Sequence, residues 1–392
     1  MSQIEDLIAK HCPNGVDEKL ISDVAELERG KYISKKTAIP GDIPVIAGGR
    51  GPAYWHNEAN RSGELLTVAG SGAYAGFVQY WDSPIFVSDA FSIITNPQVN
   101  TRFLYHWFKN QQDFLHSLKK GSGVAHVYPK DIAKLKIPVP PLEVQEEIVR
   151  ILDSFMELEA NLQTELEARR KQYEYYRDSL LSLESLSNKL RDEVKIIPLG
   201  NICKIARGAS PRPIRSFLSQ DSFASVPWIK IGDIDPAGKY VTKTSQYIRP
   251  SGVEKSREVF PGDFLLSNSM SFGRPYISKI YGCIHDGWLK LSDFEKTFLP
   301  DYLYHLLRSS QVQLQFQASV GSGTVSNLNS LAVSKVMVPV PPLAEQERIV
   351  AILDKFDALV NDLSSGLPAE IAARRKQYEY YRDRLLTFTP AK

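Results

Sequence analysis

The amino-acid sequence repeats itself, and this duplication limits the possible folds more than any other feature of the chain. The eleven residues ARRKQYEYYRD stand at 168–178 and again, letter for letter, at 373–383. Before them, KIPVPPLEVQEEIVRILDSF (136–155) matches MVPVPPLAEQERIVAILDKF (337–356). Similarity over this length indicates a tandem duplication of a unit of about 200 residues.

Each copy begins with a part that differs between the two copies. Short β-rich runs broken by Gly, Pro and Asn fill 40–98 and 226–291, and a short helix and a Gly-Ser-Gly loop follow each. We therefore predict an α+β protein in which two pseudo-symmetric α+β domains are joined by two long helices that form an antiparallel coiled coil. The expected boundaries are 1–141 and 189–341 for the domains, and 142–188 and 342–392 for the helices.

The helices are predicted from a heptad pattern. Apolar and aromatic residues recur at alternating steps of three and four at Ile148, Leu152, Phe155, Leu162, Leu166, Tyr173, Tyr176 and Leu180. At about 1.5 Å per residue, a helix over 143–183 would be roughly 60 Å long. Because the second copy carries the same pattern, we expect the two helices to pack against each other.

The second helix differs from the first by four additional residues near Ser364–Pro368. An insertion of four residues is a stutter, which locally unwinds a coiled coil. Gly366 is expected to cap one helix and Pro368 to open the next. Whether the insertion lengthens or bends the helix stays open at this point.

Composition and charge narrow the class of protein. Of the residues, 43% are hydrophobic and 23% charged, as in globular proteins. No apolar run approaches the roughly 18–20 residues of a membrane span, and the chain starts without a signal-peptide pattern, so we expect a cytoplasmic location. Residues 194–336 hold 17 Lys and Arg against 10 Asp and Glu, a balance of +7, whereas 1–135 hold 14 of each. The second region therefore has the charge of a surface that meets an anion.

No motif indicates catalysis by this chain. Gly70-Ser-Gly-Ala-Tyr-Ala75 fits a cofactor-binding loop in letters, but a strand is expected after it where such a loop requires a helix, so we interpret it as a tight turn. His106 and His305 occupy equivalent positions beside Tyr, and we interpret both as packing or capping residues. Three widely separated cysteines predict neither a disulfide framework nor a metal site.

Three hypotheses about function remain: a DNA-recognition subunit with two reading domains, a coiled-coil adaptor between two protein-binding domains, and a hydrolase whose motif is hidden. The repeated string helps to choose among these hypotheses. Its outward positions match as well as its seam positions, although the variable domains have diverged almost completely. This favours a surface that meets two copies of one partner over a recent duplication. The candidate partner-binding residues are Arg170, Gln172, Tyr175 and Arg177, with Arg375, Gln377, Tyr380 and Arg382.

The chain resembles the specificity subunits of type I restriction–modification enzymes over nearly its whole length. The resemblance is carried by the Pro-Val-Pro-Pro-Leu…Gln strings (138–145 and 339–346) and by the repeated string. The resemblance implies that each variable domain reads one half of a bipartite double-stranded DNA target. It implies that the helices space the halves and dock two methylation subunits, through which restriction subunits join. It also implies a non-catalytic chain without cofactors of its own, with S-adenosylmethionine and ATP bound by the partner subunits.

Residues that read DNA are expected on Gly-rich loops, where Arg, Lys, Asn and Gln are the usual contacts to phosphates and base edges. The candidates in the first domain are Arg29, Lys31, Lys35, Lys36, Lys119, Lys120 and His126. Those in the second domain are Arg207, Ser210, Arg212, Arg215, Asn268, Ser269, Arg274, Ser326, Asn327 and Asn329.

Overall fold

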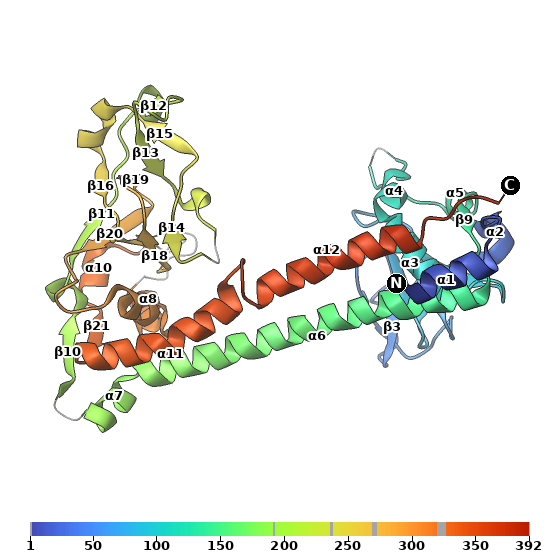
Figure 1. Ribbon diagram of the computed structural model, residues 1–392, viewed down its shortest axis with the longest axis horizontal. Coiled ribbons are helices and arrows are strands. Elements are labelled where there is room, and N and C mark those ends of the chain that lie inside the picture. Colours follow the sequence, from blue (N-terminus) through green and yellow to red (C-terminus); the bar gives the residue numbers. More distant parts are fainter. Residues whose placement is uncertain are drawn as a thin grey trace. The chain divides into compact units, whose positions relative to one another are not determined.

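A computed structural model describes residues 2–121, 123–190, 193–235, 238–268, 273–319 and 327–391. The chain separates into two compact units: unit 1 comprises Met1–Asn161 and Ala372–Lys392, and unit 2 comprises Leu162–Ile371. Both mix helices and sheets, so the predicted α+β class is confirmed. The 40-residue helix α6 (Leu142–Leu181), green in Figure 1, contributes its first part to unit 1 and the rest to unit 2.

Unit 1 consists of short strands and helices around one main sheet. Its elements are α1 (Ser2–His11), β1 (Glu18–Leu20), α2 (Ile21–Val24), β2 (Ala25–Arg29), β3 (Ile43–Ile46), β4 (Tyr54–His56), β5 (Leu65–Ala69), β6 (Val78–Trp81), β7 (Phe86–Val87), β8 (Ala90–Thr95), α3 (Thr101–Asn110), α4 (Gln112–Ser117), α5 (Pro129–Ile132) and β9 (Lys136–Pro138). Part of α12 (Leu367–Leu385) also belongs to this unit.

Unit 2 follows the same plan with additional strands. Its elements are α7 (Leu183–Leu190), β10 (Lys195–Pro198), β11 (Lys204–Arg207), β12 (Leu218–Ser219), β13 (Val226–Ile229), β14 (Tyr240–Val241), β15 (Gln246–Ile248), β16 (Arg257–Val259), β17 (Phe264–Ser267), β18 (Pro275–Ser278), β19 (Gly282–Ile284), β20 (Trp288–Ser292), α8 (Pro300–Arg308), α9 (Ser310–Ser319), α10 (Ser330–Ser334), β21 (Met337–Val340) and α11 (Leu343–Asn361).

The order of strands confirms the duplication. The main sheet is β2-β8-β5-β6 in unit 1 and β11-β20-β17-β18-β14 in unit 2. Each unit also contains a parallel pair, β3 with β7 and β13 with β19, and a two-stranded ribbon, β1 with β9 and β10 with β21. The strands β5 and β17 are buried along their whole length, which explains their mostly apolar sequences LLTVA and FLLS.

The repeated string of each copy lies in the unit formed mainly by the other copy. Residues 168–178 belong to unit 2, and 373–383 belong to unit 1. In unit 1, Tyr381 stacks on Phe155, with ring centroids 5.4 Å apart. In unit 2, Tyr176 stacks on Phe356 at 5.3 Å. In unit 1, Phe155 contacts Tyr381 and Glu159 pairs with Arg375, so residue numbers rise along one helix as they fall along the other. The predicted antiparallel packing is confirmed there.

The four-residue insertion interrupts the second helix. Helix α11 ends at Asn361 with Asp362 as its C-cap, and α12 begins at Leu367. Pro368 is in the first turn of α12, as predicted. Gly366 does not cap α11, because its carbonyl accepts the N–H of Glu370 at 3.1 Å and so starts α12. A Cβ at Gly366 would lie 2.4 Å from the carbonyl oxygen of Ala358, so only glycine fits this approach.

A buried glutamine from each copy fixes the variable part to its helix. The side chain of Gln346 accepts the N–H of Leu299 at 2.9 Å and donates to the carbonyls of Thr297 at 2.9 Å and Pro341 at 3.0 Å. Gln145 makes the corresponding bonds, to the N–H of Asn100 and the carbonyls of Gln98 and Pro140. The glutamine of the repeated Pro-Pro-Leu…Gln string thus has a structural role.

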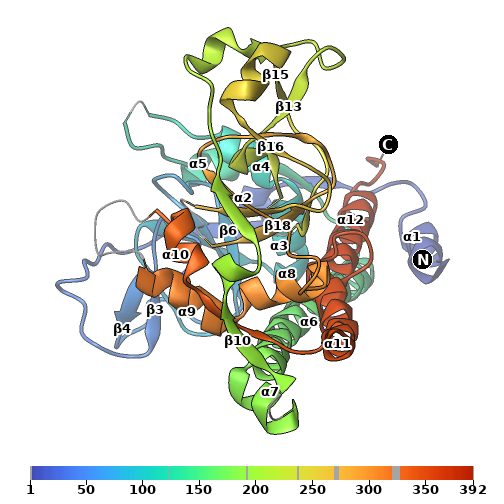
Figure 2. The same ribbon diagram turned by 90° about the vertical axis from the view of Figure 1, so that its left-hand side faces the viewer.

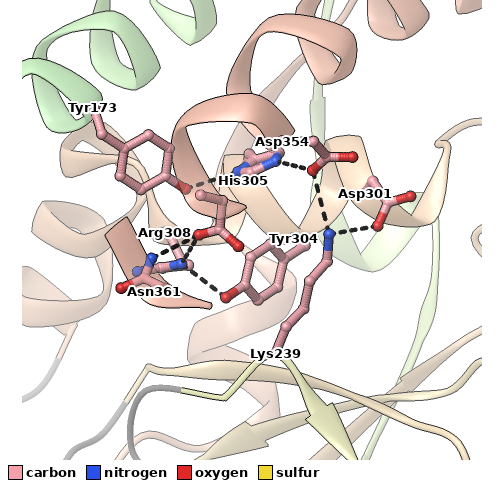
Figure 3. A network of polar contacts seen from close by, with 9 residues as sticks. Tyr173, Lys239, Asp301, Tyr304, His305, Arg308, Asp354 and Asn361 are labelled. Atoms are coloured by element: carbon pink, nitrogen blue, oxygen red, sulfur yellow. Dashed lines mark hydrogen bonds and ion pairs between the residues drawn. The ribbon is translucent and has the colours of Figure 1, made fainter. Parts of the chain in front are cut away.

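The two buried histidines are also structural, as predicted. His305 Nε2 lies 2.8 Å from Asp354 Oδ1, and its Nδ1 lies 2.9 Å from the Tyr173 hydroxyl. Figure 3 shows this arrangement, in which Lys239 also reaches Asp354, at 3.3 Å. Helix α8, which contains His305, packs against α11, and both helices are labelled in Figure 1 and Figure 2. His106 makes the same contact with Asp153 in unit 1, at 2.8 Å. Burial lowers the pKa of both imidazoles, although the aspartates oppose this shift.

Candidate nucleic-acid interface

The first candidate loop leaves the main sheet at the same point in both units. Arg29 ends β2 and Arg207 ends β11, and a glycine follows each. The N–H of Gly30 donates to the carbonyl of Ala90, and that of Gly208 to the carbonyl of Trp288. A Cβ on either glycine would lie within 2.3 Å of a backbone oxygen. The Arg-Gly pair therefore starts an exposed loop at equivalent positions of the two units.

In unit 1, two Gly-rich segments lie together. The N–H of Gly72 donates to the carbonyl of Ala125 at 2.9 Å, and Ser71 pairs with His126 as an isolated bridge. Lys119 Nζ donates to the carbonyl of Ala73 at 2.8 Å, and Lys120 forms an ion pair with Asp131 at 2.8 Å. The predicted loop thus exists, but both lysines already have internal partners.

Tyr128 joins the two predicted clusters of unit 1. The guanidinium of Arg29 lies 5.8 Å from the centroid of the Tyr128 ring, and the His126 ring stacks on it at 6.0 Å. Lys130 Nζ lies 5.7 Å from the same ring. Sequence reasoning missed Tyr128 and Lys130, although an aromatic residue between His126 and Lys130 was an available signal. Lys31, Lys35 and Lys36 are exposed on the loop after β2.

In unit 2, three of the ten predicted residues line a cavity of about 820 Å³. Its walls include Ser210, Arg212 and Arg215, together with Trp228, Lys230, His285 and Asp286, which were not predicted. The Ser210 hydroxyl donates to Asp286 Oδ1 at 2.6 Å, and this bond holds the pKa of Asp286 below its usual value. Arg207 Nε donates to the carbonyl of Asp286 at 3.2 Å. The side chains of Arg212 and Arg215 are exposed at the cavity rim.

The remaining candidates of unit 2 differ in exposure. Asn268 is only 3% exposed, and its amide donates to the carbonyl of Asp286 at 2.7 Å, so it holds two loops together. Arg274 is half-buried, with its guanidinium 5.7 Å from the Tyr276 ring. Asn329 caps α10 by accepting the N–H of Ala332, and Asn327 is exposed. Ser269 and Ser326 lie outside the described residues.

The repeated strings expose the same face in both units. Tyr175 is 69% exposed and Tyr380 is 60% exposed. The other exposed positions also correspond: Arg170, Lys171 and Glu174 in one string, and Arg375, Lys376 and Glu379 in the other. Gln172 and Gln377 are half-buried and accept bonds from Arg169 and Arg374.

One residue of the predicted outward face does not project outward. Arg177 is only 8% exposed and forms an ion pair with Asp178 at 3.1 Å. Asp178 in turn accepts the N–H and the hydroxyl of Ser310, so α9 covers this side of α6. The equivalent Arg382 is half-buried and pairs with Asp383 at 2.8 Å. The outward face is therefore narrower than predicted.

In the described ranges, no group of His, Cys, Asp and Glu could hold a metal ion, and no helix is long and apolar enough to cross a membrane. Cys203 and Cys283 are buried, and burial raises the pKa of each thiol to about 12. The segment Gly70–Ala75 leads into strand β6, so it lacks the helix that a dinucleotide loop requires.

Comparison with known proteins identifies the family. The model of the type I restriction modification DNA specificity domain matches residues 13–168 and 191–373. A Haemophilus influenzae protein named as a type I restriction enzyme specificity subunit is 31% identical over 95% of this chain and 96% of its own length. The EcoR124I/EcoR124II specificity subunit of Escherichia coli is 33% identical over 77% of this chain and 75% of its own length.

A solved structure agrees with the fold. The type I restriction–modification S subunit of M. genitalium has a TM-score of 0.60 and 17% identity, covering 94% of this chain and 96% of that one. The family match spans most of both repeats, and each repeat contains the sheet and helix contacts described above. The chain belongs to the specificity (S) subunits of type I restriction–modification systems.

Proposed function

We propose that the chain is the DNA-reading subunit of a type I restriction–modification complex, in which unit 1 reads one half of a bipartite target and unit 2 reads the other. One observation carries this proposal: the Arg-Gly loop starts at the same point of both folds, while the side chains around it differ. Equivalent placement suits two domains that approach DNA alike, and different side chains suit two different half-sites.

The side chains of the two loops suit contacts with DNA. In unit 1, Arg29, Lys130 and His126 surround Tyr128, so positive charge lies beside a ring. In unit 2, exposed Arg212 and Arg215 stand at the rim of the cavity beside Lys230. Exposed arginines and lysines contact phosphates, and arginine also bonds the major-groove edge of guanine. Asn268 is a weaker candidate because its amide is buried and bonded within unit 2.

The repeated strings are proposed to dock two methylation subunits, one on each copy. Support comes from the exposed face that both copies share, centred on Tyr175 and Tyr380. Because the face is identical in sequence, one kind of partner can bind both copies. Restriction subunits would join through this complex, and S-adenosylmethionine and ATP would bind to the partner subunits. The chain itself would catalyse nothing.

We also propose functional boundaries at the positions expected from the sequence. Residues 1–141 and 189–341 would form the target-recognition domains, and 142–188 and 342–392 would form the helices that space the half-sites. Helix α6 ends at Leu181 and α11 ends at Asn361, so neither spacer is a single helix over its whole range.

Mapping methylated adenines in a host that expresses the chain with its methylation subunit tests the proposal. A bipartite motif with a fixed gap is expected. Exchanging residues 1–141 for those of a relative should change one half-site and leave the other. A complex that assembles but methylates without any sequence preference would contradict the reading role and favour an adaptor.

A further inference from the structure

Two cations of unit 1 lie against one aromatic ring, and neither forms an ion pair within the described residues. Lys109 Nζ at the end of α3 lies 5.1 Å from the centroid of Phe77, and the Arg50 guanidinium lies 5.6 Å from the same ring. Burial, together with the charges of Arg382 and Arg50, lowers the pKa of Lys109. No carboxylate lies within ion-pair distance of Lys109 in the parts of the chain that the structure describes, and Arg382 pairs only with its neighbour Asp383.

In unit 2, Arg308 occupies the position that corresponds to Lys109. Arg308 follows His305 by three residues, as Lys109 follows His106. Arg308 forms an ion pair with Asp357 at 3.0 Å and donates to the Tyr304 hydroxyl at 2.7 Å. In Figure 3, Arg308 lies beside Tyr304 and Asn361. An internal carboxylate therefore neutralises this cation in unit 2.

Unit 1 lacks that carboxylate. Asp357 follows Asp354 by three residues, and the residue three positions after Asp153 is Met156. A buried or half-buried cation without a counter-ion is costly, because its charge loses hydration without gaining a partner. Neighbouring like charges add to this cost. An anion bound from outside the chain would remove the cost of this unpaired charge.

The cations adjoin the candidate DNA loops of unit 1. The Arg50 guanidinium lies 4.7 Å from the centroid of Tyr74, which belongs to the Gly-rich segment beside 119–127. Lys119 bonds the carbonyl of Ala73, next to Tyr74. A DNA strand that contacts these loops would therefore pass close to Lys109.

We propose that Arg50 and Lys109 bind one phosphate group of the DNA backbone; this inference rests on the DNA-binding function proposed above. A carboxylate of the methylation subunit fits these cations less well than a DNA phosphate does. That partner would dock on a face common to both units, whereas unit 2 neutralises the equivalent cation internally with Asp357. The site is thus specific to the first half of the chain, as a contact to one half-site would be.

Two substitutions test the site from opposite directions. Lys109→Gln removes the half-buried cation of the site. Met156→Asp removes no cation but supplies the carboxylate that unit 2 has at the equivalent position, so it should fill the site from within. Lys10→Gln, at an exposed lysine of α1, is the matched control. Thermal unfolding checks that each variant is folded, and Met156→Asp should unfold at the same or a higher temperature than the wild type.

The affinity of the complex with methylation subunits for a 30-base-pair duplex is measured between 50 and 200 mM salt. One phosphate contact contributes about 0.9 to the slope of log affinity against log salt. Both test variants should lose this amount, so their affinity should fall about 3.5-fold less than that of the wild type over this range. Lys10→Gln should keep the wild-type slope.

Unchanged slopes in both test variants would overturn the phosphate site. Weaker docking of the methylation subunit with an unchanged slope would also overturn it, because the cations would then bind a protein carboxylate. A wild-type complex that binds no duplex would overturn the proposed DNA-reading function together with the site, so the two failures are distinguishable.

Discussion

Replacing Tyr175 with alanine should weaken the docking of one methylation subunit, and replacing Tyr380 should weaken the other. An aromatic side chain buries about 150–250 Å² when fully covered, so the 69% exposure of Tyr175 leaves about 100–170 Å² for a partner. At about 25 cal/mol per Å² this amounts to about 2.5–4 kcal/mol. Ordering the side chain costs about 1 kcal/mol, which leaves about 1.5–3 kcal/mol, or a roughly 10- to 150-fold loss of affinity.

Titration calorimetry with the methylation subunit measures the two sites. Each single variant should keep one wild-type site and show one weakened site, and the double variant should weaken both. Tyr32→Ala is the matched control, because Tyr32 is 79% exposed but lies outside the strings. All three substitutions should change the unfolding free energy by no more than about 0.5 kcal/mol. If the double variant still binds two methylation subunits with wild-type affinity, the shared face is not the docking surface.

Four further predictions concern stability, pH, DNA contacts and spacing. Gln346→Ala should lower the unfolding free energy by about 3 kcal/mol in urea titrations, because it leaves the N–H of Leu299 and two carbonyls unpaired; a change below about 1 kcal/mol would contradict the role of this glutamine. Although burial opposes this effect, His305 and Lys239 hold the pKa of Asp354 below its usual value. The stability that this carboxylate contributes is therefore present above about pH 4 and is lost as the pH falls through the folded pKa. Melting temperatures of Asp354→Asn should accordingly depend less on pH below 4 than those of the wild type. Arg212→Ala with Arg215→Ala should reduce the salt slope of DNA binding by about 1 for each phosphate contacted, and an unchanged slope and methylation motif would exclude both residues. Inserting four strong helix formers after Leu162 should extend α6 by about 6 Å and lengthen the preferred gap by about two base pairs, whereas an unmoved gap with full activity would show that the helices are not the spacer.

The sequence predicted the parts of the fold that depend on periodicity. The heptad positions of α6 gave the antiparallel partner, and the stacking of Phe155 on Tyr381 follows from two seam positions. The match between the copies predicted two equivalent domains. Arg177 was placed wrongly because a heptad pattern encodes only the partner helix. Its contacts with Asp178, and those of Asp178 with Ser310, depend on a domain packed against another side of α6.

The candidate site was predictable only in part, because side chains meet there across long stretches of sequence. Arg29 and His126 were each found from local composition, and Tyr128 is close to His126 in sequence, but no local pattern indicated that the distant Arg29 would lie against the same ring. Asn268 is a residue type that commonly contacts DNA and lies on a Gly-rich segment, yet its amide donates to the carbonyl of Asp286. Burial of this kind depends on the fold of unit 2 and not on neighbouring residues.

The interchange of the repeated strings has a consequence for synthesis on the ribosome. Unit 1 consists of Met1–Asn161 and Ala372–Lys392, so 211 positions separate the end of its first segment from the start of its second (372 minus 161). At about 5–20 residues per second, the ribosome needs roughly 10–40 s to supply the missing segment. During this interval Phe155 of the nascent chain lacks its stacking partner Tyr381, and Val144 lacks Leu385 and Leu386 of the same apolar core. Chaperones that cover apolar surface therefore have time to act on unit 1 before unit 2 is complete.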